Sequence, residues 1–200
     1  MITGVQFWNS KAHYFVQTNN PTEEYLRKQG RGNWLVSCGP TAAVGCLAAM
    51  GRDVAIRCPG GYAPQPEEVL MDYFNDPRNY DALRRVRAET PPENWKGNEI
   101  PQFYTVAVPA VFGVPAKFLW SLDINKIAAQ VQSGRAVQIC LDKPGHFIAV
   151  VAYDEARKEL IYNDPWPERF PDKDGFNRRM NLLELMTNIQ PYMIVYGEGA

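Results

Sequence analysis

The chain has 200 residues, of which 46% are hydrophobic and 22% are charged, and its formal net charge at pH 7 is -1. Such values are ordinary for a globular protein, and the length suits one domain built of two lobes. Basic and acidic side chains are balanced in both halves of the chain, so nothing indicates a nucleic acid or an anionic membrane as partner.

The first part of the chain is predicted to be mainly helical. The clearest helix follows Cys38, because Pro40 suits a first helical turn and the segment to Met50 is apolar on nearly every side. A helix of this kind is buried in a core rather than lying on a surface, and Gly51 is expected to end it. Further helices are predicted in a short segment after Asn20 and over about 66–87, 102–112 and 123–133.

The second part of the chain is predicted to form a sheet. Short runs rich in β-branched and aromatic residues are separated there by turn residues, at 136–141, 146–153, 159–164 and near 192–197. We therefore expect an α+β fold in a single domain spanning 1–200. Its helical lobe would cover about 1–133 and its antiparallel sheet lobe about 134–200.

Cys38 is a candidate nucleophile because it stands at the start of the buried helix. Unpaired backbone N–H groups and the helix dipole at this position are expected to lower a thiol pKa and to hold a developing oxyanion. A buried core cysteine is the alternative interpretation. No pair of cysteines has CxxC spacing, so we expect no zinc site and reduced thiols at all four positions (Cys38, Cys46, Cys58 and Cys140).

A cysteine nucleophile needs a base, which is usually histidine, and the chain has two. His146 opens an apolar strand, whereas His13 lies in an irregular segment where a structural role is favoured. A hairpin through 154–159 would bring Asp164 back beside His146 as the group that orients the base. The neighbouring Asn163 is expected to point to the opposite face. Taken singly, His146 also suits a packing role and Asp164 a turn.

Three blocks in this order resemble the C39-like family of papain-fold cysteine peptidases: "SCGPTA" at Cys38, "GHFIAVVAYD" at His146 and "IYNDPW" at Asp164. The resemblance implies a papain-like architecture with the active site in the cleft between the lobes. It also implies a glutamine upstream of the cysteine that completes the oxyanion hole. The segment "HYFVQTNN" is similar to that block and assigns the role to Gln17, with Gln29 as the second choice.

The combined pattern predicts a cysteine peptidase or amidase that hydrolyses a peptide or amide bond and needs no cofactor or metal. Asp172 and Asp174 form a fragment of a calcium loop, but a solvated turn is the favoured interpretation. Among substrates, a peptidoglycan peptide cut by a phage-type (endolysin-like) endopeptidase is favoured. An intracellular processing peptidase, an acyltransferase that forms the same thioester, and an inactive papain-like binding module stay open as alternatives.

The apolar runs of the sequence, such as "FIAVVAY", are far shorter than the ~20 residues that span a bilayer. The segment "MITGVQFWNSKAH" has neither a basic start nor a continuous apolar core, so we expect no signal peptide. The expected location is therefore cytoplasmic synthesis, which allows later action on the cell wall.

Overall fold

A computed structural model of the chain describes residues 1–20, 37–56, 64–87, 100–121, 123–143 and 145–199. The segment with the predicted short helix after Asn20, together with Gln29 and Cys58, lies outside these ranges. The helices are α2 (Cys38–Ala49), α3 (Pro66–Asn75), α4 (Tyr80–Val86), α5 (Tyr104–Phe112), α6 (Ile124–Gln132) and α7 (Leu182–Met186). The strands are β1 (Ile2–Gly4), β2 (Ala116–Trp120), β3 (Ala136–Leu141), β4 (His146–Asp154), β5 (Glu159–Asn163), β6 (Arg178–Asn181) and β7 (Ile189–Tyr196).

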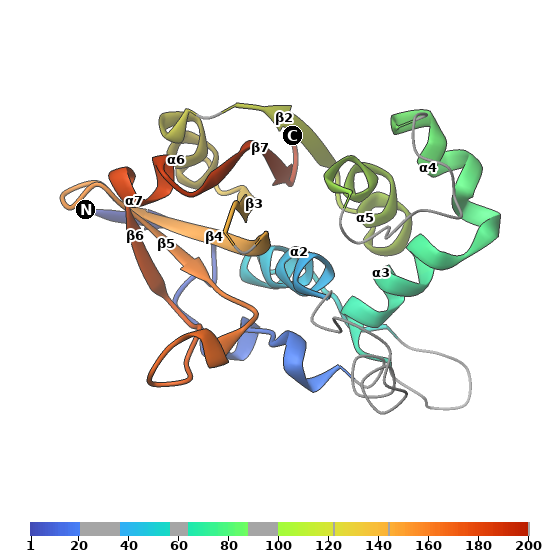
Figure 1. Cartoon of the computed structure of the whole chain (residues 1–200), viewed down its shortest axis with the longest axis horizontal. Helices are drawn as coiled ribbons and strands as arrows, with labels where there is room; N and C mark the ends of the chain where they lie inside the picture. Colours follow the sequence, from blue (N-terminus) through green and yellow to red (C-terminus); the bar gives the residue numbers. More distant parts are fainter. Residues whose placement is uncertain (21–36, 57–63, 88–99, 122, 144, 200) are drawn as a thin grey trace.

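A seven-stranded antiparallel sheet forms the centre of the molecule (Figure 1). Its strand order is β2–β7–β3–β4–β5–β6, and β1 pairs with the far end of β4, where Ile2 lies opposite Asp154. The segregated helices and antiparallel strands confirm the expected α+β class. Two strands, β1 and β2, come from the part of the chain that the sequence assigned to the helical lobe.

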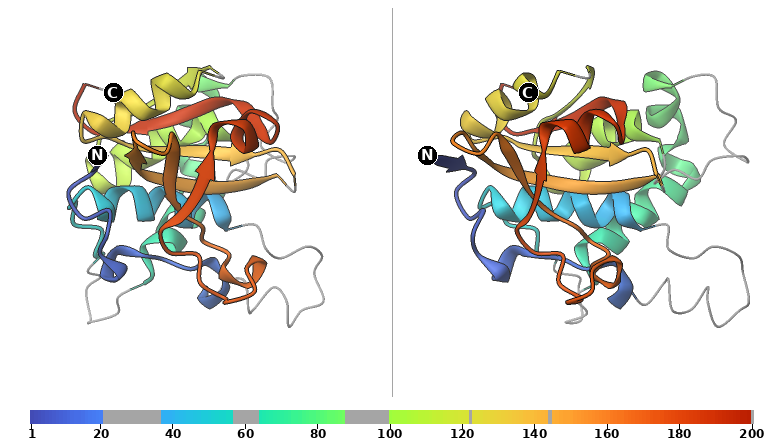
Figure 2. Two further views of the ribbon diagram at one scale, coloured as in Figure 1. Left: turned by 90° about the vertical axis from the view of Figure 1, so that its left-hand side faces the viewer. Right: turned by 60° about the vertical axis from the view of Figure 1, so that its left-hand side comes forward.

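Both faces of the sheet are covered by helices (Figure 2). On one face, α2 packs on β4 and α5 packs on β2, and α3 packs on both helices; Phe147, Ala149 and Val151 of β4 belong to this core. On the other face, α6 packs on the alternate residues Ile148 and Val150. The continuous apolar run of β4 follows from this arrangement, because a strand buried on both faces has no polar side to present.

Among the helices, α2 makes the most extensive contact with the sheet, and all twelve of its residues are buried. Its small side chains allow a close approach: a Cβ added at Gly45 would lie 3.8 Å from the Cβ of Ala149. The first turn is also tied to the sheet, because the buried amide of Gln138 on β3 donates to the Gly39 carbonyl oxygen at 3.1 Å. The position of Cys38 is thereby fixed relative to β3 and β4.

Most predicted elements are present, and their boundaries differ from the predicted ones by at most three residues. The predicted helix over 66–87 is divided, since Pro77 follows Asp76 and a proline excludes helical geometry at the residue before it. The short elements β1, β2, β6 and α7 were not predicted. The three strands are held mainly by pairing with other strands, and α7 is a helix of only five residues, so all four carry little periodic signal of their own.

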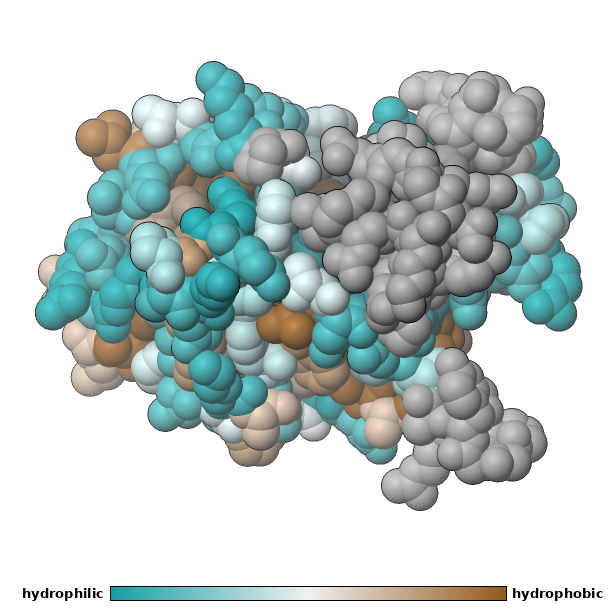
Figure 3. Space-filling model, turned by 60° about the horizontal axis from the view of Figure 1, so that its bottom comes forward, coloured by the Kyte–Doolittle hydropathy of each residue, from teal (hydrophilic) through white to brown (hydrophobic). Residues whose placement is uncertain are grey.

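The face turned forward in Figure 3 is predominantly hydrophilic, with smaller hydrophobic patches between the polar areas. Among the described residues, no helix is both long enough and apolar enough to cross a membrane.

Candidate active site

Cys38 is the first residue of α2, and its side chain is buried, with 8% of the residue exposed. Burial raises the pKa of the Cys38 thiol to about 12, although the backbone N–H groups of Phe147 and Gly39 act in the opposite direction. The sequence predicted a lowered thiol pKa at this helix start. That prediction is wrong for the free protein, because the desolvation of a thiolate outweighs the nearby N–H groups.

His146 and Asp164 form a buried pair at the same end of the sheet. The Nε2 of His146 lies 2.6 Å from Oδ1 of Asp164, and the two side chains are 3% and 1% exposed. Gly145 precedes the histidine with a φ of +79°, a conformation that glycine adopts without strain, and so lets β4 begin at His146 directly after the turn. The thiol of Cys38 lies against the backbone N–H of Phe147, the residue that follows His146.

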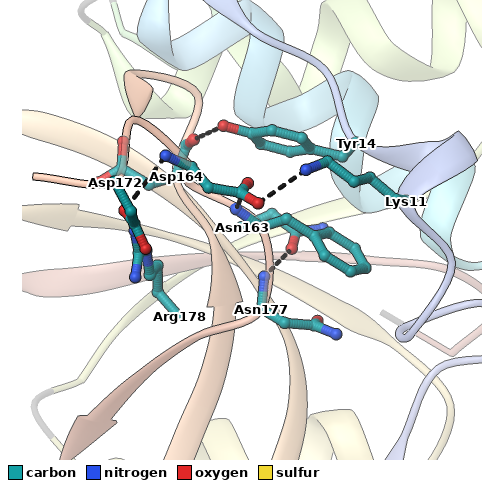
Figure 4. Close-up of polar contacts among 9 residues, drawn as sticks. Lys11, Tyr14, Asn163, Asp164, Asp172, Asn177 and Arg178 are labelled. Carbon is teal, nitrogen blue, oxygen red and sulfur yellow. Dashed lines mark hydrogen bonds and ion pairs between the residues drawn. The ribbon is translucent and has the colours of Figure 1, made fainter. Parts of the chain in front are cut away.

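Other groups besides His146 hold Asp164 in place. Its Oδ1 also accepts the backbone N–H of Trp166 at 2.9 Å, and its Oδ2 accepts Nη1 of Arg169 at 3.1 Å. Its main chain is fixed as well, because its N–H donates to the Gly175 carbonyl at 2.8 Å. Its carbonyl accepts a hydrogen bond from the Tyr14 hydroxyl at 2.7 Å, and Figure 4 draws this contact. The loop over 165–177 therefore wraps around the carboxylate.

Asn163 occupies a different environment. It pairs with Ala149, which faces α2, and its Oδ1 accepts the backbone N–H of Asn177 at 3.0 Å (Figure 4). The structure thus brings Asp164, and not Asn163, into contact with His146. This agrees with the alternation of side chains along a strand.

Gln17 opens the short 3₁₀ helix Gln17–Asn19 and is 1% exposed. Within the described part of the chain, neither atom of its side-chain amide has a hydrogen-bond partner. Its main chain is anchored next to both candidate site segments. The N–H donates to the Pro165 carbonyl at 2.8 Å, and the Asn20 amide bridges the Gln17 carbonyl to the Ser37 hydroxyl, with both distances 3.1 Å.

Sequence reasoning missed the residues that surround these side chains. Trp166 places its ring 6.0 Å from the His146 ring in an edge-on orientation. Tyr14 and Arg169 hold Asp164, and Asn20 joins two segments that the sequence separates. Trp166 lies inside the quoted block "IYNDPW", and Tyr14 and Asn20 lie inside "HYFVQTNN", but the sequence assigned none of them a contact, and Arg169 lies in no quoted block.

The remaining polar candidates are engaged elsewhere. His13 stacks on Phe7 with ring centroids 4.8 Å apart. In the predicted turn, Asp174 pairs with Lys11 at 2.7 Å and Asp172 pairs with Arg178. Cys46 lies fully buried inside α2.

The family model described as the "Peptidase_C39 like family" matches residues 10–181. The chain belongs to this Peptidase_C39-like family. The match confirms the expected papain-like fold. Membership also indicates a cysteine peptidase as the general class of activity.

Two solved structures are similar to this C39-like chain, each at 13% identity. One is described as a C39-like peptidase from Bacillus anthracis, with a TM-score of 0.34 over 50% of this chain and 60% of that one. The other is the N-terminal peptidase C39 like domain of a toxin secretion ATP-binding protein from Vibrio parahaemolyticus, with a TM-score of 0.38 over 64% of this chain and 95% of that one. The aligned part thus spans 60% of the first structure's length. A comparison with curated proteins gives no match.

Proposed function

We propose that the protein is a cysteine peptidase in which Cys38 is the nucleophile and His146 the general base. Asp164 orients the base, and Gln17 stabilises the oxyanion. The observation that carries this proposal is the buried 2.6 Å contact between His146 and Asp164, beside a peptide group that touches the Cys38 thiol. A buried carboxylate on one ring nitrogen fixes the ring direction and its tautomer.

The reaction follows from these positions. Because Asp164 engages Nε2 of His146, Nδ1 is the ring atom left to take the Cys38 proton as sulfur attacks the substrate carbonyl. The same nitrogen then protonates the leaving amine as the carbon–nitrogen bond breaks. Water, deprotonated by His146, attacks the thioester and restores the thiol. The Gln17 amide, which has no partner among the described residues, and backbone N–H groups at the start of α2 would hold the oxyanion.

The timing of the first proton transfer is set by burial. A thiol whose pKa is raised to about 12 is neutral in the free protein. We infer that His146 removes the proton as the substrate is attacked, rather than in a resting thiolate–imidazolium pair. Binding of the substrate in place of water would be part of the activation.

For the substrate, we propose a peptidoglycan peptide, cut in the manner of a phage-type lysis enzyme. This proposal narrows the peptide substrates that the C39-like family indicates, and a processing role inside the cell is the second candidate. The same thioester intercepted by an amine would give acyl transfer. An inactive binding module is disfavoured because the candidate Cys, His and Asp are all present and two of them are in contact.

The test is incubation of the protein with purified peptidoglycan and, separately, with a positional-scanning peptide library, followed by mass spectrometry of the products. We expect new amine and carboxyl ends, with no release by Cys38→Ala. Cys46→Ala is the matched control, since this thiol is buried in the same helix and should leave cleavage unchanged. Equal loss in both variants, or no cleavage of any peptide by the parent protein, would refute the proposed function.

A further inference from the structure

A single amide interrupts a strand that is otherwise apolar. All residues of β3 are buried, and the third of them is Gln138, which is 0% exposed. Ala136 and Cys140, which share its face of the strand, belong to the core that contains Cys38 and α2. Gln138 therefore directs its amide into that core, on the side of the candidate nucleophile.

The Gln138 amide is engaged by groups from three other elements. Its Nε2 donates to the Gly39 carbonyl oxygen of α2 at 3.1 Å, and its Oε1 accepts a hydrogen bond from the Tyr196 hydroxyl of β7. Burial raises the pKa of Tyr104, the first residue of α5, and a hydrogen bond with the Gln138 side chain acts in the opposite direction. A bond that favours the phenolate is one in which the amide N–H donates. We call these four residues the amide network.

Stability alone does not call for the amide network. Gln138, Tyr104 and Tyr196 are each 0% exposed. Replacing both partners of a buried hydrogen bond by apolar groups of the same shape is nearly neutral or stabilising for folding, so Gln138→Leu together with Tyr196→Phe would leave a well-filled core. An apolar core does not supply direction, whereas a satisfied polar network fixes the orientation of each of its groups.

The group that the amide network orients is the residue next to the candidate nucleophile. Gly39 follows Cys38 in the first turn of α2 and has no side chain that packing could hold. Its N–H lies beside the Cys38 thiol, so a rotation of the backbone at Gly39 would move the thiol relative to the N–H groups that face it. The bond from Gln138 to the Gly39 carbonyl opposes this rotation.

The same amide connects the nucleophile to the strands that carry the base. In the antiparallel register of β3 and β4, Gln138 lies opposite Ala149, and Leu141 lies opposite His146. Tyr196 adds β7, which pairs with the other edge of β3. Cys38 and His146 are therefore held against one frame of three central strands.

We propose that Gln138 is a positioning residue, which holds the first turn of α2 so that the Cys38 thiol stays aligned with His146. This inference rests on the proposed function of Cys38 and His146. Because Gln138 is fully buried, it acts through Gly39 and not by touching a substrate. A misplacement of a catalytic group by about 1 Å can lower a rate about a hundredfold, so loosening one tie should have a somewhat smaller effect.

The first test measures the rate of Cys38 alkylation by iodoacetamide from pH 6 to 9, read by mass spectrometry, and it needs no substrate. We expect Gln138→Leu to lower the rate roughly tenfold, because the thiol is aligned with its base for less of the time. Tyr196→Phe keeps the bond to Gly39 but frees the amide oxygen, so its decrease should be smaller. Ile139→Val is the matched control, since Ile139 is equally buried on β3 but packs on the opposite face with α6.

Gln138→Glu separates positioning from packing. A protonated carboxyl group can donate to the Gly39 carbonyl and accept from Tyr196, as the amide does, whereas a carboxylate has no proton to donate. We expect this variant to be alkylated at close to the parent rate at pH 6 and to fall behind the parent as the carboxyl group ionises at higher pH. A rate at pH 6 as low as that of Gln138→Leu would overturn the positioning role.

The second test compares kcat and KM for a peptide that the parent protein cleaves. Gln138→Leu should lower kcat roughly tenfold and change KM by less than about twofold, because the residue does not touch the substrate. An unchanged alkylation rate in Gln138→Leu, an equal decrease in Ile139→Val, or an effect on KM alone would overturn the proposal. Absence of cleavage by the parent protein would refute the proposed function alone, since the alkylation rates do not depend on cleavage.

Discussion

Asp164→Asn tests the candidate site with little change in shape. The carboxylate accepts from three donors: Nε2 of His146 and the Trp166 N–H on Oδ1, and Nη1 of Arg169 on Oδ2. An amide has only one acceptor oxygen. If that oxygen faces His146, the amide N–H₂ meets the Arg169 guanidinium, which cannot accept a hydrogen bond. If the oxygen instead faces Arg169, the N–H₂ meets Nε2 of His146 and favours the tautomer in which Nε2 carries no proton, which is the wrong one for catalysis.

The magnitude follows from the hydrogen bonds that the substitution removes. Hydrogen bonds to charged groups contribute about 1.5–3 kcal/mol each, so breaking the bond from Arg169 should lower the free energy of unfolding by about 2 kcal/mol. With the other orientation, the wrong tautomer should lower kcat by several orders of magnitude, about 10⁴-fold when a serine protease undergoes the same change. Asp164→Ala is the less informative variant, because it removes the acceptor of three buried or partly buried donors and costs about 3–5 kcal/mol.

The assay combines urea denaturation with the rate of Cys38 alkylation by iodoacetamide from pH 6 to 9, which needs no substrate. We expect Asp164→Asn to be alkylated more slowly than the parent at each pH, since removing the anion makes proton transfer from the thiol to His146 harder. Asn163→Ala is the control, because Asn163 contacts the loop and not the histidine. A slower rate in Asn163→Ala with an unchanged rate in Asp164→Asn would refute the reasoning.

Four further outcomes are expected. In the parent protein the alkylation rate should rise throughout pH 6–9, because burial raises the thiol pKa to about 12; a plateau below pH 7 would instead indicate a resting ion pair. Gln17→Ala should lower kcat roughly a hundredfold without lowering the melting temperature, since its amide has no partner among the described residues; a fall in melting temperature alone would contradict the oxyanion role. Gly175→Ala should destabilise the protein and slow alkylation together, because a Cβ would overlap the Asp164 carbonyl and the Tyr14 hydroxyl; unchanged denaturation would argue against that packing. Burial raises the pKa of Glu67 from 4.5 to about 7, so the folded protein binds a proton that the unfolded chain releases, and its stability falls as pH rises between these values. In denaturant titrations, Glu67→Gln should therefore raise the free energy of unfolding by up to about 3 kcal/mol at pH 8 and by little at pH 4.

The elements that the sequence predicted well are those with strong local patterns. Helix α2 and strands β3, β4 and β5 are apolar over most of their length and bounded by glycine, proline or charged turns. The hairpin from β4 to β5 follows from its polar link, and so does the approach of Asp164 to His146. By contrast, β2 is short and is recognisable as a strand only from its pairing with β7, which lies far along the chain.

The environment of the candidate site was the harder part to predict. The position of Cys38 at a helix start was visible, but its burial depends on β3 and β4 packing over it, and burial reversed the expected pKa shift. The hydrogen bond from the Tyr14 hydroxyl to the Asp164 carbonyl, which we call the clamp, joins residues that lie 150 positions apart in the chain. No local pattern encodes a hydrogen bond of that separation, because either residue alone is compatible with a simple turn or packing role.

The clamp also bears on when activity can arise during biosynthesis. A ribosome releases the chain from its N-terminus, and Tyr14 appears long before Asp164 and Gly175, which complete its contacts. Since Asp164 can be fixed only when both ends of this span are present, a growing chain carries Cys38 before the contacts that hold Asp164 can form. The proposed catalytic arrangement is therefore completed only after Gly175 has been synthesised.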